Sequence, residues 1–163
     1  MNFPQRTAVR RTGSGGAMGV VVLLLSILSL PRSAAAALGA DVSTVAADGA
    51  SMKATVRSTQ QALYSVHEML TPSGTTVREF VAPSGWVFAV TWQGPFLPDL
   101  RQTLGTYFEA YQSAPRSKQA GRNRLLLEQP GLVVHSVGHP RAFFGRAYVP
   151  KLVPAGVAVE QLQ

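Results

Sequence analysis

The pattern of apolar and polar positions is clearest between Tyr64 and Gln93, where it predicts three β-strands joined by two similar turns. Each turn has a proline followed two residues later by a glycine, in the segments Thr71–Thr75 (TPSGT) and Ala82–Trp86 (APSGW). Proline suits the first central position of a type I turn, and glycine suits the position after the two central residues, where φ must be positive. Both segments therefore predict a three-residue hairpin loop with a G1 bulge.

These turns predict the register of the strands and hence their two faces. Thr71 is expected to pair with Thr75 and Val81 with Val87, after which side chains alternate between faces. We call the bulkier set the heavier row and expect it to form the core beneath a helix; it comprises Tyr64, Val66, Glu68, Arg78, Phe80, Trp86, Phe88, Val90 and Trp92. The lighter row is expected to form the free surface; it comprises Leu63, Ser65, His67, Met69, Val77, Glu79, Val81, Val87 and Ala89.

The chain after Gln93 predicts one helix and a second group of strands. Pro98 and Asp99 are typical of a helix start, and a single apolar stripe then runs to about Ser113 through Leu100, Leu104, Tyr107, Phe108 and Tyr111. Strands are predicted at 124–128, 132–137 and 141–149, the last in the interior of a sheet because both its faces are half apolar. The expected fold is α+β, an antiparallel β-meander sheet with one main amphipathic helix packed on one face.

The first 37 residues are predicted to be a signal peptide preceding that fold. Arg10 and Arg11 supply a positive region, residues 19–30 a short apolar run, and cleavage is expected near Ala36 or Ala37. The run is too short for a transmembrane anchor. The residues after the two arginines do not continue as a twin-arginine signal would, so the general secretory route is favoured.

The remaining boundaries follow from composition. Residues 38–60 are expected to be a flexible mature N-terminal arm, 61–156 a single α+β domain, and 157–163 a C-terminal tail. The predicted location is the periplasm or the extracellular medium. The pattern leaves open whether the true start is Met1 or Met18, and it does not indicate an oligomeric state.

Charge and cysteine content argue against several classes of function. The formal charge is +7, but four of the fifteen basic residues and none of the eight acidic ones lie in the first 37 residues, so the rest carries only +3. No nucleic-acid partner is therefore predicted. The chain has no cysteine, which excludes disulfides, thiol catalysis and cysteine-bound zinc, and no motif indicates a cofactor.

The histidines are the residues to consider for a catalytic site or a metal site. The predicted register places His67 opposite Glu79, an arrangement in which the carboxylate would orient the imidazole, as in a hydrolase. The alternative interpretation is structural: His67 and Glu79 would form a cross-strand polar pair, as Glu68 and Arg78 are expected to do. His135 and His139 are four residues apart, about 13 Å along a strand, so no metal site is predicted.

Basic and aromatic residues interleave in the last strand. Arg141, Phe143, Phe144, Arg146 and Tyr148 are candidate binding residues for an envelope protein or another cell-envelope component, although each also suits an ordinary strand. A basic, turn-rich segment at 115–123 is interpreted as a solvated linker, with contact to an anionic surface as the alternative.

Several motifs together resemble one protein family: GTTVREFV from Gly74, GWVFAVTWQGP from Gly85, LPDLR from Leu97, LGTYF from Leu104 and HPRAFFGRAYVP from His139. The chain is similar over about 38–156 to small exported proteobacterial proteins classified as domain of unknown function 2844. This resemblance implies export and a single domain, and it brings no activity or site residue. The sequence favours a non-enzymatic exported binding module, with a small hydrolase-like enzyme using His67 and Glu79 as the alternative.

Overall fold

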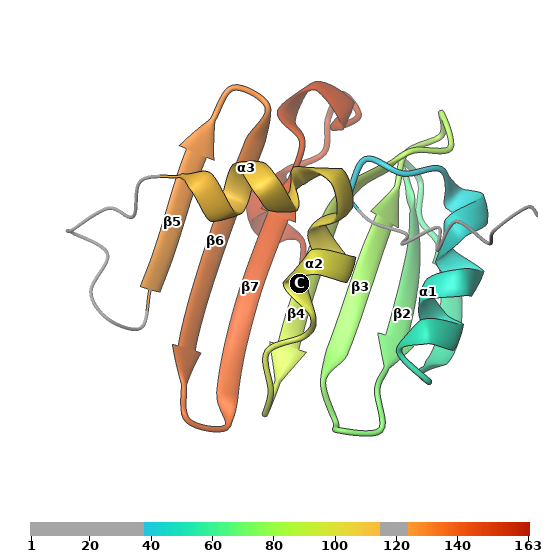
Figure 1. The fold of residues 1–163 in the computed structure, drawn as a ribbon. Coiled ribbons are helices and arrows are strands. Elements are labelled where there is room, and N and C mark those ends of the chain that lie inside the picture. The colour runs from blue at the N-terminus through green and yellow to red at the C-terminus, as the bar shows by residue number, and fades with distance from the viewer. Residues whose placement is uncertain (1–37, 115–123) are drawn as a thin grey trace, which may run out of the picture. The chain divides into compact units, whose positions relative to one another are not determined.

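The computed structural model describes residues 38–114 and 124–163, so the predicted signal peptide and the basic segment 115–123 lie outside the described residues. Within them, seven strands form one antiparallel sheet in the order β1-β2-β3-β4-β7-β6-β5 (Figure 1). The strands are β1 (Thr55–Gln60), β2 (Ser65–Leu70), β3 (Thr76–Val81), β4 (Val87–Gly94), β5 (Arg124–Gln129), β6 (Leu132–His139) and β7 (Ala142–Tyr148). The predicted α+β class is confirmed, and β7 is an interior strand as expected.

Both predicted turns are present. The backbone N–H of Thr71 donates a hydrogen bond to the carbonyl oxygen of Thr75, and the N–H of Ala82 donates to the carbonyl oxygen of Trp86. The glycines that close the turns, Gly74 and Gly85, have φ of 83° and 87°, which is the left-handed conformation that the turn chemistry requires. The β2–β3 register therefore agrees with the prediction from the sequence.

The predicted faces are wrong beyond the second turn, because a bulge shifts the register of β4. Val81 pairs with Val87 as expected, but the next residue of β3, Phe80, pairs with Ala89. One residue of β4 is thus inserted, and every later side chain moves to the opposite face. Val90 and Trp92 consequently join the lighter row, which becomes the larger core face instead of a free surface.

The helical segments cover that larger core face. They are η1 (Val42–Thr44), α1 (Val45–Ser51), α2 (Leu100–Leu104), η2 (Gly105–Tyr107) and α3 (Phe108–Ser113). In Figure 1, α1 lies over the β2 side of the sheet and α3 over β6 and β7. The segment expected to be a flexible arm, 38–60, thus contains η1, α1 and the edge strand β1.

The predicted single helix is two short helices. Asp99 caps the first, its Oδ1 accepting hydrogen bonds from the backbone N–H groups of Arg101 and Gln102 at 2.9 and 3.4 Å. Gly105 ends this helix with φ 50° and ψ −123°, which lie outside the helical region. The apolar stripe continues across the break, since Leu100, Leu104, Tyr107, Phe108 and Tyr111 all belong to or pack on the same core.

The opposite face of the sheet is covered by the C-terminal segment, 150–163, which includes η4 (Pro150–Leu152) and η5 (Val159–Gln161). A second core forms here from Phe80, Phe88, Ala89, Leu162 and neighbouring apolar side chains. Much of the heavier row is therefore buried by the end of the chain and not by the predicted helix. No helix in the described ranges is long and apolar enough to cross a membrane.

Candidate ligand-binding site

One line of polar side chains crosses the sheet on the face that carries the C-terminal segment. Cross-strand pairing places these residues side by side, one from each successive strand between β6 and β1. We call this line the polar row; in spatial order it consists of His135, Arg146, Thr91, Arg78, Glu68 and Arg57. The β4 bulge determines its composition, because without the inserted residue Thr91 would face the helices.

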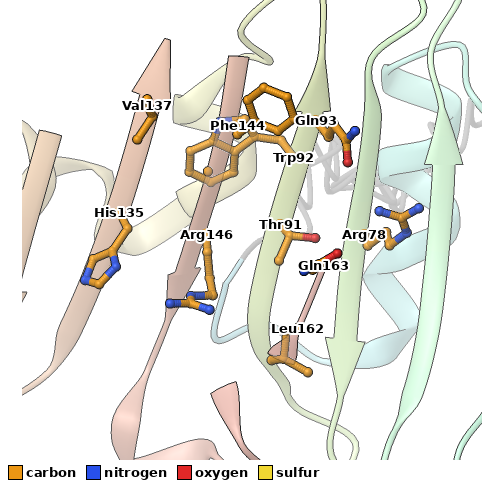
Figure 2. A pocket seen from close by; sticks show the side chains of 11 residues that line it. Arg78, Thr91, Trp92, Gln93, His135, Val137, Phe144, Arg146, Leu162 and Gln163 are labelled. Carbon is orange, nitrogen blue, oxygen red and sulfur yellow. The ribbon is translucent and has the colours of Figure 1, made fainter. Parts of the chain in front are cut away.

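A pocket of about 460 Å³ opens over the middle of the polar row. Apolar side chains from three elements complete its wall, namely Val137 of β6, Phe144 of β7 and Leu162 of the C-terminal segment. Figure 2 shows the polar members on neighbouring strands, with the last residues of the chain beside them: His135, Arg146, Thr91, Arg78, Leu162 and Gln163. The pocket thus has a polar floor and an apolar margin, as small-molecule sites do.

Each of the two arginines that line the pocket is held by one contact. Arg78 Nε lies 2.7 Å from Glu68 Oε2, which confirms the predicted pairing of these two residues. Arg146 Nη1 donates a hydrogen bond of 2.7 Å to the carbonyl oxygen of Val159, so the guanidinium is fixed against the C-terminal segment. Both donors are therefore positioned by the fold before any ligand arrives.

Three buried polar atoms in the row have no hydrogen-bond partner among the described residues: Thr91 Oγ1, Arg146 Nε and His135 Nε2. The His135 atom lies 3.5 Å from Glu128 Oε1, a charge contact without hydrogen-bond geometry. Buried polar groups in folded proteins normally have partners. All three residues line the same pocket.

The structure places the five candidate binding residues of the last predicted strand in different surroundings. Phe144 and Arg146 line the pocket, and Phe144 is 47% exposed. Tyr148 packs against the second core on the same face. Arg141 lies exposed in the β6–β7 turn with φ 66°, and Phe143 lies on the helix-covered face beside Gly138.

His67 and Glu79 are Cα partners across β2 and β3, on the face covered by helices. No hydrogen bond or ion pair joins these two side chains in the described part of the chain. His67 Nδ1 instead lies 2.8 Å from Ser58 Oγ of β1, and its Nε2 lies 3.4 Å from Ser65 Oγ. Partial burial lowers the pKa of His67. Sequence spacing did not indicate Ser58, because β1 was not predicted.

Glu79 is fully buried and faces Asp48 of α1, which is also buried. Burial and the nearby charge of Asp48 raise the pKa of Glu79 to about 9. Gln102 Nε2 of α2 donates to Asp48 Oδ1 at 3.3 Å. This acidic pair therefore connects α1 and α2 to the sheet, and Glu79 is protonated at neutral pH.

No group of three or more histidine, cysteine, aspartate or glutamate side chains that could hold a metal ion occurs in the described ranges. The pocket itself has one imidazole and two guanidinium groups on its wall but no acidic side chain. This donor set is suited to binding an anion and not a cation.

The chain belongs to the protein family DUF2844, described as a protein of unknown function, whose model matches residues 34–162. Neither the comparison with curated proteins nor that with solved structures gives a match. The family membership predicted from the sequence motifs is therefore confirmed, and its description assigns no biochemical function.

Proposed function

We propose that this protein is a non-enzymatic binding module that takes a small ligand into the pocket over the polar row. The observation that carries the proposal is the cluster of unpartnered buried atoms of Thr91, Arg146 and His135 around that pocket. An unsatisfied buried polar group costs about 1–3 kcal/mol, and a ligand that supplies a partner recovers part of that cost. The pocket volume is within the usual range for small-molecule sites, roughly 300–1,000 Å³.

Fragment binding followed by NMR tests the proposal. A library of neutral and charged fragments is expected to shift the backbone resonances of Thr91, Phe144 and Leu162, which line the pocket. Replacing Phe144 by alanine should weaken the best fragment about fivefold or more, since an aromatic contact contributes about 1 kcal/mol or more. The matched control is Phe96→Ala, which removes another exposed phenylalanine outside the pocket. Shifts confined to other surfaces would contradict the proposal.

A second candidate function is a small hydrolase on the opposite face. It is favoured by the 2.8 Å contact of Ser58 Oγ with His67 Nδ1, which supplies a nucleophile next to a base. Because the pKa of His67 is lowered, its imidazole is neutral near pH 7 and can accept a proton. Glu79 would act at most through the packing of β2 and β3, since it faces Asp48.

A fluorophosphonate probe distinguishes the hydrolase from the binding module. A hydrolase should be labelled at Ser58, and Ser58→Ala should abolish the label while Ser84→Ala, a change in an exposed turn, leaves it intact. An unlabelled wild-type protein would contradict the second candidate and leave the ligand pocket unaffected.

We further propose that the protein acts in the periplasm or outside the cell after removal of residues 1–37. The support is the order of basic residues, short apolar run and alanine-rich cleavage motif in that segment. Mass spectrometry of the protein from its native host should find a new N-terminus close to Ala37. A mature chain that still begins at Met1 would contradict this proposal.

A further inference from the structure

The charge on the pocket wall is unbalanced. Arg78 has an acidic partner in Glu68, but the guanidinium of Arg146 donates its hydrogen bond to a neutral group, the carbonyl oxygen of Val159. No acidic side chain lines the pocket, and the neighbour of Arg146 on β6 is His135, whose Nε2 lies 3.5 Å from Glu128 Oε1. An uncompensated, partly buried guanidinium is favourable chiefly where an anion can approach it.

The geometry of Arg146 suits recognition of a compact anion. Its Nη1 bond to Val159 restricts the side chain, and its Nε hydrogen remains without a partner. Thr91 is its cross-strand neighbour and contributes a hydroxyl that also lacks a partner. Two prepositioned donors from adjacent strands can therefore be satisfied together by the oxygens of one acidic group.

The outer side of the pocket is apolar and partly open. Phe144 and Val137 are cross-strand partners in the row next to the polar row, and Leu162 covers the pocket from the C-terminal segment. Figure 2 shows the Phe144 ring above the line joining His135, Arg146 and Thr91. A ligand whose anionic group lies on that line would place its remaining atoms against these apolar side chains.

We propose that the ligand is a small organic anion, with a carboxylate or phosphate bound by Arg146 and Thr91 and an apolar body against Phe144. This inference rests on the proposed ligand pocket and specifies its chemistry. His135 stands beside Arg146, and its imidazole can donate a ring N–H to phosphate oxygens.

Three probes with the same ring test this assignment: benzoate, phenyl phosphate and the neutral benzamide. We expect both anions to bind at least tenfold more tightly than benzamide, because only they pair with the guanidinium. Raising the salt concentration should weaken the binding of both anions and leave the affinity of benzamide nearly unchanged. The relative affinity of benzoate and phenyl phosphate identifies the preferred acidic group.

Two variants locate the interaction. Arg146→Gln should weaken the preferred anion about tenfold or more, whereas Arg57→Gln, an equal charge change at the exposed far end of the polar row, should not. Because Arg146→Gln also loses the bond to Val159, Thr91→Val provides a second test that preserves that bond and all charges. It should weaken the anion about threefold to tenfold.

The outcomes separate this inference from the proposed function. If benzamide binds the pocket as tightly as the anions, or if both variants retain wild-type affinity for the anion, the anion assignment is wrong and the pocket remains a ligand site. If no fragment of any charge shifts the pocket resonances, the proposed function itself is wrong.

Discussion

Replacing Glu79 by glutamine is expected to remove most of the pH dependence of stability between about pH 5 and 9. Burial beside Asp48 raises the pKa of Glu79 from 4.5 to about 9, so the folded protein retains a proton that the unfolded chain releases. Folding is then linked to proton uptake throughout this window. The free energy of unfolding should fall as pH rises, by at most about 1.4 kcal/mol per pH unit, until Glu79 ionises in the folded state.

Chemical denaturation at several pH values measures this effect. The Glu79→Gln variant keeps the shape and the donor of a protonated carboxyl group, so its stability should vary little over the window. The control is Glu68→Gln, which removes a half-exposed glutamate of β2 and should retain the wild-type slope. Equal slopes of unfolding free energy against pH for wild type and Glu79→Gln would show that the acidic pair does not govern the pH dependence of stability.

Replacing Gly145 by alanine is expected to destabilise the fold by about 1–3 kcal/mol, or more if the core cannot adjust. A β-carbon at this position would collide with the indole of Trp92, its cross-strand partner on β4. Trp92 is only 2% exposed and is among the largest fully buried side chains, so the ring has little room to move. Gly145 is thus required by the close approach of an aromatic ring and not by its backbone angles.

Thermal melting should show the loss as a lower transition temperature for Gly145→Ala. The matched control is Gly131→Ala in the β5–β6 turn, where a β-carbon would have no atom within 4 Å. An unchanged midpoint for Gly145→Ala would mean that the Trp92 ring does not occupy this position in solution. Melting of both variants to the same lower temperature would indicate a general effect of removing glycine.

Local chemistry explains why the β2–β3 hairpin was predicted correctly. A proline and a glycine in the right order specify the turn, and the turn specifies the register, so Glu68 opposite Arg78 needed no tertiary information. The apolar stripe from Leu100 to Tyr111 could also be predicted from the sequence, because helical periodicity persists across the break at Gly105. The break itself was not predicted; it lies at Gly105, whose backbone angles are outside the helical region.

The candidate site was only partly predictable. Phe144 and Arg146 were selected because basic and aromatic residues alternate in β7. Thr91 and Arg78 join them only through the pairing of β4 with β7, which are far apart in the chain because β4 ends at Gly94 and β7 begins at Ala142. Residues 157–163 were expected to be a tail without assigned structure, yet Leu162 is 5% exposed and lines the pocket.

By itself the sequence determined the two turns, the strand segments after β1, the helical apolar stripe and the family, because each depends on neighbouring residues. The tertiary structure decided which side chains of the sheet lie on the helix-covered face and which lie on the pocket face. The inserted residue in β4 moves Val90 and Trp92 beneath the helices, and it brings Thr91 to the pocket face. The reason is geometric: side chains alternate with a period of two, so a single bulge reverses every later assignment along the strand.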